Sequence, residues 1–253
     1  MPYTRSLDEI RLIDRAWAGD KAAHIGELIH AGFNAPRGFC ITADAYRDTL
    51  AANQIHAAIA ARLKTTEIDD PVELEAAAEE IRAWIESAPI PAPMEQEIHA
   101  AAHALLGGAA CPLFAVRASR VVEDVPNPAA SGLQQAYLAV TADALLDHIR
   151  KCWSAPWNSR AIYFRNRKKI DQAQVTMAVV VQPMLNADAA GVTFTANPLT
   201  GAANEILTDA TLGLGEAIIA ARWKPDHFVV DKTNHAISDR VIVNKSVMET
   251  ATA

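Results

Sequence analysis

The chain has 253 residues, of which 51% are hydrophobic, and this is enough to bury a sizeable core as one large domain or two lobes. Its 23 basic and 30 acidic side chains give a formal net charge of −7, which argues against broad binding to nucleic acid or to an anionic membrane surface. Any anion that binds here must therefore be held by a local basic site.

The cysteines and the N-terminal residues indicate the cellular setting. Cys40, Cys111 and Cys152 are far apart and odd in number, so neither a disulfide framework nor a zinc site is indicated. The N-terminus lacks the apolar core of a secretion signal, and no run approaches the ~18 apolar residues that a membrane-spanning helix needs. We therefore expect a soluble, cytoplasmic protein with reduced thiols.

The first predicted elements are a strand or short helix over 7–18 and a helix over 21–31, with Gly19 between them. Lys21 stands at the start of that helix, where a point charge can face a bound phosphate. A solvated surface lysine fits the same residues.

Three amphipathic helices come next. Residues 46–63 have the spacing of one helix capped by Thr42, and a second helix begins at Asp70, whose next residue is a proline. A third follows a proline-rich stretch and carries His99 and His103 at a metal-ligand spacing. Because no third ligand accompanies these two histidines, we predict no metal site there.

The functional interpretation depends on the stretch 114–140. A short apolar run, 113–116, predicts a buried strand that delivers Arg117 at its end, where a fixed cation can face an anion. The small-residue loop 126–132 can fold over phosphates, because Gly132 lets the backbone approach closely.

Two helices are predicted over 142–153 and 157–169, and the basic residues of the second are typical of a solvated face. The run 175–183 then predicts a strand buried on both faces, with Gln182 and Met184 at its end. Strand-end amides and carbonyls beside an apolar slot suit a flat heterocycle. An ordinary core strand that ends in a proline turn is the alternative.

The last third of the chain predicts a β-structure. Residues 190–195 and 205–209 form a hairpin-like pair of strands joined by an Asn-Pro-Leu-Thr-Gly turn. A Gly-Leu-Gly-Glu turn at 213–216 and a strand at 227–231 follow.

These blocks occur in the order found in one protein family. An Arg-Ser-Ser-Ala-x-x-Glu-Asp signature with a glycine loop resembles the N-terminal ATP-grasp domain shared by phosphoenolpyruvate synthase, pyruvate phosphate dikinase and rifampicin phosphotransferase. It is matched here by Arg117, Ser119, Glu123, Asp124, Gly132, Gln134, Tyr137 and Leu138. Five further stretches are also similar to blocks of this family. They are Gly-x-Lys at 19–21, Pro-x-Gly-Phe at 36–39, Gly-Val-x-Phe-Thr at 191–195, Gly-Leu-Gly-Glu at 213–216 and Pro-Asp at 225–226.

The resemblance implies an α/β (α+β) fold of the ATP-grasp-like class. It would consist of an N-terminal lobe, 1–181, and an incomplete second lobe, 182–253, with a nucleotide cleft between them. ATP would be held by Lys21, Arg117, Gly132, Gln134, Gln182, Met184 and Glu216, of which Lys21 and Arg117 would also be catalytic.

The resemblance also implies a function and a missing part. The chain looks like the ATP-binding subunit or domain of a phosphoenolpyruvate-synthase-like phosphotransferase, a kinase or dikinase. It would pass a phosphoryl group from ATP to a histidine on a partner domain or chain in trans, and then to a small-molecule acceptor. Nothing after residue 246 matches the family segments that coordinate magnesium, so the chain looks C-terminally truncated and its Mg²⁺ ligands are expected largely from outside.

A different class of function remains open. A non-catalytic nucleotide-binding or regulatory module that has lost the metal site would keep the same motifs. In both readings, neither nucleic acid nor a membrane is expected as a partner.

Some positions depart from the family pattern. Asp20 replaces a glycine beside Lys21, where it either weakens nucleotide binding or turns outward. Leu133 and Ala136 replace a polar amide and a threonine hydroxyl in the glycine loop. Arg120 stands where the family has alanine, and could add a cation.

Overall fold

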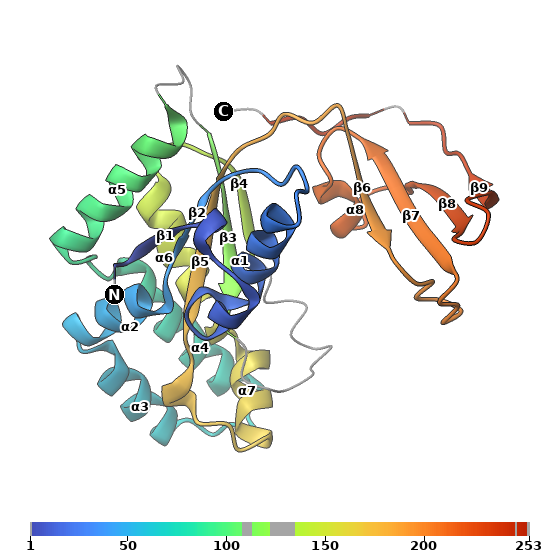
Figure 1. Ribbon diagram of the computed structural model, residues 1–253. Coiled ribbons are helices and arrows are strands. Elements are labelled where there is room, and N and C mark those ends of the chain that lie inside the picture. The colour runs from blue at the N-terminus through green and yellow to red at the C-terminus, as the bar shows by residue number, and fades with distance from the viewer. Residues whose placement is uncertain (1, 108–112, 122–134, 246, 252–253) are drawn as a thin grey trace. The chain divides into compact units, whose positions relative to one another are not determined.

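The computed structural model describes residues 2–107, 113–121, 135–245 and 247–251 (Figure 1). The chain forms two compact units, Met1–Met184 and Leu185–Thr252. Both units mix helices with antiparallel sheet, as expected for the α/β (α+β) class. The predicted nucleotide cleft between two lobes stays a prediction.

The first unit is built on a five-stranded sheet in the order β1-β2-β5-β3-β4, and every neighbouring pair of strands is antiparallel. The bounds are β1 Thr4–Ser6, β2 Phe39–Ile41, β3 Phe114–Arg120, β4 Ala136–Val140 and β5 Met177–Pro183. The central strand β5 pairs with β3 over its whole length, from Met177 opposite Arg120 to Pro183 opposite Phe114.

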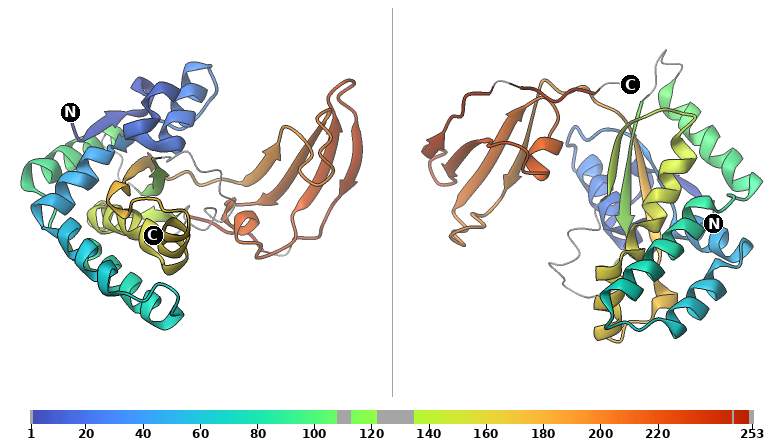
Figure 2. Two further views of the ribbon diagram at one scale, coloured as in Figure 1. Left: turned by 90° about the horizontal axis from the view of Figure 1, so that it is seen from below. Right: turned by 180° about the vertical axis from the view of Figure 1, so that it is seen from behind.

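Helices cover both faces of this sheet (Figure 2). They are α1 Arg15–His30, α2 Ala43–Ala52, α3 Ile55–Thr65, α4 Pro71–Ser87, α5 Ala92–Leu106, α6 Leu145–Ser154 and α7 Ser159–Arg167. Short 3-10 turns lie at Leu7–Glu9, Leu12–Asp14, Ala155–Trp157 and Gln172–Gln174.

The alternation of side chains along β5 divides the core in two. Ala178 and Val180 pack in a small cluster with α1, whereas Val179 and Val181 pack in the larger cluster with the other helices. The strand is therefore buried on both faces, as the run 175–183 predicted.

The second unit is a four-stranded antiparallel sheet in the order β6-β7-β8-β9, with a short helix. The bounds are β6 Ala189–Phe194, β7 Glu205–Leu212, β8 Asp226–Asp231, β9 Ile237–Val241 and α8 Glu216–Ile219. Gly213 has a φ of 73°, and a Cβ there would lie 2.0 Å from the carbonyl oxygen of Glu249. The glycine thus lets the chain at Glu249 pack against the start of this turn.

Several predicted elements are confirmed. Asp70 caps α4 by accepting hydrogen bonds from the N–H groups of Val72 and Glu73, at 2.9 and 3.3 Å. The hairpin of β6 and β7 and the strand at β8 are also present. None of the helices in the described part of the chain is long and apolar enough to cross a lipid bilayer.

Other predictions are wrong in detail. The single helix predicted over 46–63 is two helices, α2 and α3, because the chain turns at Gln54, whose φ is 58°. Arg117 lies in the middle of β3 rather than at the end of a strand, since small residues continue the strand under α1. Strand β9 was not predicted.

The C-terminus of α7 carries local backbone strain. The N–H of Lys169 donates to the carbonyl of Asn166 at 3.0 Å, and the N–H of Ile170 donates to that of Arg165 at 2.9 Å. These two bonds form a Schellman motif, in which the left-handed position usually holds glycine. Here it holds Lys169, with a φ of 56°.

Lys169→Gly should stabilise the fold. A Cβ in the left-handed region costs about 1 kcal/mol, so the free energy of unfolding in urea should rise by about that amount. The matched control is Lys168→Gly, one residue earlier, where φ is −89° and the backbone is not strained. Equal effects of the two substitutions would show that the left-handed conformation is not what matters.

Candidate functional site

Helix α1 is broken at Gly19, whose φ of 75° and ψ of 167° are not helical. A second helical segment starts immediately afterwards and carries Lys21 in its first turn. A Cβ on Gly19 would lie 2.3 Å from the carbonyl oxygen of Ser119 in β3. Only glycine accommodates both this backbone conformation and this contact.

The side chain of Ser119 joins the two helical segments. Its Oγ donates to the carbonyl of Ala18 at 2.7 Å and accepts from the N–H of Ala22 at 3.1 Å. In an unbroken α-helix these two backbone groups would bond directly to each other. All three residues are fully buried.

Arg117 lies two residues before Ser119, so its side chain leaves the same face of β3. Its Nη1 lies 3.5 Å from Oε1 of Gln182 on the neighbouring strand β5. The amide nitrogen of Gln182 donates to the carbonyl of Pro36 at 2.8 Å, which fixes the side-chain amide in place. Gln182 is 5% exposed, so the amide of this strand end is held inside the unit.

Lys21 and Arg117 are electrostatic neighbours. Burial is the larger cause that lowers the pKa of Lys21 to about 8, and repulsion from the Arg117 charge lowers this pKa further. Burial also lowers the pKa of Arg117, although a guanidinium stays charged in proteins.

Neither cation has an acidic partner in the part of the chain that the structure describes. The ion pairs among those residues involve other basic groups, and the guanidinium of Arg117 faces the neutral amide of Gln182. Two partly desolvated positive charges that repel each other are stabilised when an anion binds between them. The arrangement therefore suits a phosphate group.

The structure shows where Asp20 and Arg120 lie, two residues that depart from the family pattern. The carboxylate of Asp20 accepts a hydrogen bond from Nε of Arg15 at 2.7 Å, and it is not among the charges that shift the Lys21 pKa. Asp20 is therefore paired away from Lys21. Arg120 lies three residues after Arg117, so its side chain leaves the opposite face of β3.

The structure describes two of the remaining predicted site residues, Met184 and Glu216. Met184 follows β5, and its N–H donates to the carbonyl of Leu113 at 2.7 Å. Glu216 begins α8 in the second unit, where its carboxylate lies 3.3 Å from Nη2 of Arg222. Two further predicted site residues, Gly132 and Gln134, lie outside the residues that the structure describes.

Sequence reasoning missed two members of the cluster. Ser119 was matched to the family signature without a role, and Cys152 was interpreted only as a buried thiol. The thiol lies near enough to Lys21 for each to affect the other, and burial raises the Cys152 pKa to about 12. No pattern in the sequence links Cys152 to Lys21, because α6 and α1 are distant along the chain.

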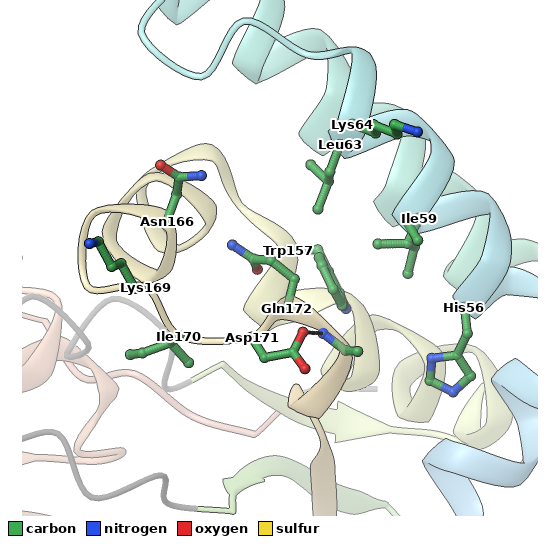
Figure 3. A pocket seen from close by; sticks show the side chains of 12 residues that line it. His56, Ile59, Leu63, Lys64, Trp157, Asn166, Lys169, Ile170, Asp171 and Gln172 are labelled. Carbon is green, nitrogen blue, oxygen red and sulfur yellow. Dashed lines mark hydrogen bonds between the residues drawn. The ribbon is translucent and has the colours of Figure 1, made fainter.

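A separate hollow of about 540 Å³ lies in the first unit, between α3 and the segment that follows α7 (Figure 3). Ile59, Leu63 and Trp157 form apolar parts of its wall, and none of the predicted site residues that the structure describes lines it. The ammonium groups of Lys64 and Lys169 point away from it in Figure 3. Ligand sites gather converging polar groups, so we assign no ligand to this hollow.

Lys21→Met should stabilise the free protein and change its pH dependence. The folded pKa of about 8 is below the ordinary value of 10.5, so between these pH values the unfolded chain binds more protons. The Lys21 contribution to stability therefore rises with pH across this window, and Lys21→Met should remove that rise. The free energy of unfolding in urea, measured at pH 7.5 and pH 9.5 for both proteins, tests this expectation.

The control for this experiment is Lys64→Met, which removes an exposed lysine of α3. Its pH dependence should match that of the unsubstituted protein. If Lys21→Met and Lys64→Met behave alike, the charge of Lys21 is not desolvated.

The chain is similar to proteins of one known family. Residues 15–253 match the family model described as pyruvate phosphate dikinase, AMP/ATP-binding domain. Phosphoenolpyruvate synthase of Pyrococcus furiosus is 32% identical over 281 residues, covering 97% of this chain and 34% of the relative. Phosphoenolpyruvate synthase of Aeropyrum pernix is 36% identical over 243 residues, covering 94% of this chain and 30% of the relative.

Rifampicin phosphotransferase of Streptomyces sviceus is also similar, with 36% identity over 230 residues, 90% of this chain and 26% of the relative. The chain thus spans about a third or less of the length of these relatives. The mixed helix and sheet architecture agrees with the ATP-grasp-like domain that the sequence motifs predicted. The chain belongs to the family of the pyruvate phosphate dikinase AMP/ATP-binding domain.

Proposed function

We propose that the chain binds ATP as the nucleotide-binding part of a phosphoenolpyruvate-synthase-like phosphotransferase. The observation that carries this proposal is the pair of desolvated cations, Lys21 and Arg117. They are near enough for the Arg117 charge to lower the Lys21 pKa, and neither has a carboxylate partner among the described residues. Membership of a family described as an AMP/ATP-binding domain supports a nucleotide as the source of the phosphate.

In this proposal each described residue has one task. Lys21 and Arg117 hold phosphate oxygens and oppose the negative charge that spreads over them during transfer, the contribution on which phosphoryl transfer most depends. A lysine with a pKa of about 8 is mainly protonated at pH 7, and a bound phosphate favours its charged form further. Gln182 would hold the guanidinium of Arg117 in place, because its amide oxygen faces Nη1 of Arg117 and its amide nitrogen donates to the Pro36 carbonyl. Met184, just after β5, would be the contact to the nucleotide base.

The remaining steps of the proposed reaction use groups beyond these. The phosphoryl group would pass to a histidine on a partner domain or chain, and from there to a small-molecule acceptor. The names of the similar proteins, phosphoenolpyruvate synthase and rifampicin phosphotransferase, support an acceptor of that size. Magnesium would neutralise phosphate charge, with ligands largely from outside this chain.

Arg117→Ala should weaken ATP binding while the fold persists. A charge-assisted hydrogen bond contributes about 1.5–3 kcal/mol, so the Kd for ATP in the presence of magnesium should rise by about tenfold to about a hundredfold. Isothermal titration calorimetry measures this Kd. Arg120→Ala removes the same charge from the opposite face of the same strand, and its affinity should match the unsubstituted protein. Equal losses in both variants would locate the effect in general charge.

Transfer to a partner is tested separately from binding. The chain is mixed with a polypeptide that carries the candidate phosphohistidine domain, and with ATP labelled in the β or the γ position. We expect acid-labile, base-stable label on the partner, and no label with Lys21→Met. If ATP binds but no label appears from either position, the non-catalytic nucleotide-binding or regulatory module is the better description.

A further inference from the structure

We propose that Ser119 is a positioning residue of the phosphate site: its hydroxyl holds the break in α1 open and thereby directs Lys21 toward Arg117. The positioning is a property of the free protein. Only its effect on ATP affinity rests on the function proposed above.

The first support is the place of the hydroxyl in the helix ladder. The Oγ of Ser119 stands between the carbonyl of Ala18 and the N–H of Ala22, at 2.7 and 3.1 Å. A group that inserts into this ladder bends or breaks a helix. Ser119 thus supplies the donor and the acceptor that make the break at Gly19 tolerable.

The second support is the apolar surroundings of these groups. Ala18 and Ala22 belong to the small core cluster with α1, where no water reaches them. A buried backbone N–H or carbonyl without a partner is strongly destabilising. The thiol of Cys40 also lies 3.5 Å from the Ala18 carbonyl oxygen, but thiols are weak donors.

Without the hydroxyl, the backbone can repair itself in one simple way. The N–H of Ala22 can bond directly to the carbonyl of Ala18 if Gly19 adopts helical angles. A regular helix turns about 100° per residue, so this change redirects Lys21 relative to the first turn. The ammonium group would then leave the position where Arg117 acts on it.

The third support is that one strand determines both positions. Arg117 and Ser119 are two residues apart on the same face of β3, so the strand carries one cation and the residue that places the other. Its pairing with β5 through seven residues makes it a rigid base. Rigid placement of charges is what binding and transfer of a phosphate require.

The test compares Ser119→Ala with Ser154→Ala. Ser154 is also buried, 2% exposed, and its Oγ contacts Glu86 Oε1 at 2.6 Å and the Lys151 carbonyl at 3.0 Å, so the control removes a similar hydroxyl. The pH dependence of acetylation at each lysine, resolved by mass spectrometry, reports the Lys21 pKa without any nucleotide.

In the unsubstituted protein and in Ser154→Ala, Lys21 should titrate near its pKa of about 8. In Ser119→Ala this pKa should move up by at least about one unit, because Lys21 moves away from Arg117 and toward water. Both variants should lose thermal stability. A Ser119→Ala protein that is less stable but has an unchanged Lys21 titration would falsify the positioning role.

Ser119→Cys serves if Ser119→Ala does not fold, because a thiol keeps a weak donor and acceptor in the same place. Its Lys21 pKa should lie above that of the unsubstituted protein, and an unchanged value would again overturn the proposal.

ATP affinity separates this inference from the proposed function. Ser119→Ala should bind ATP about tenfold more weakly than Ser154→Ala. If the Lys21 titration moves and ATP affinity does not, Ser119 positions Lys21 and the phosphate role of Lys21 is wrong. If the titration stays and affinity falls, Ser119 acts on ATP by another route and the positioning role is overturned.

Discussion

The contact between Gly19 and the backbone of Ser119 is the constraint on which the candidate site depends. Because Gly19 has no Cβ, α1 lies directly on β3 at this point, and the helix can break there. The break starts a new helical segment at Lys21 and leaves two buried backbone groups that Ser119 satisfies. Gly19, the break in α1 and the hydroxyl of Ser119 thus form one local structure, in which each part depends on the other two.

The pairing of β3 with β5 carries that local structure into the rest of the first unit. Val180 lies opposite Arg117, and Gln182 lies opposite Ala115, so the guanidinium and the amide meet on the α1 face. The other face of the same strands holds the large apolar core. One central sheet therefore separates the packing that stabilises the unit from the polar groups that serve the candidate site.

The charges of the site oppose stability in the free protein. Lys21 is desolvated and repelled by Arg117, and no acid among the described residues compensates them. In the proposed function, a phosphate bound between the two cations would turn the same repulsion into affinity. Lys169 shows a strain of a different kind, in a backbone angle rather than a charge, just after α7.

The sequence by itself determined the family, the class of fold and the ordered motifs, because spacing and residue type are visible without contacts. It predicted the buried strand β5, the cap at Asp70 and the hairpin of β6 and β7, all of which depend on local pattern. Only the tertiary structure decided that Arg117 lies within a strand, that Asp20 turns to Arg15, and that α1 breaks over Ser119. The first and the last of these features join residues far apart along the chain, Arg117 with Val180 and Ala18 with Ser119, and their geometry is fixed by packing that no local pattern records.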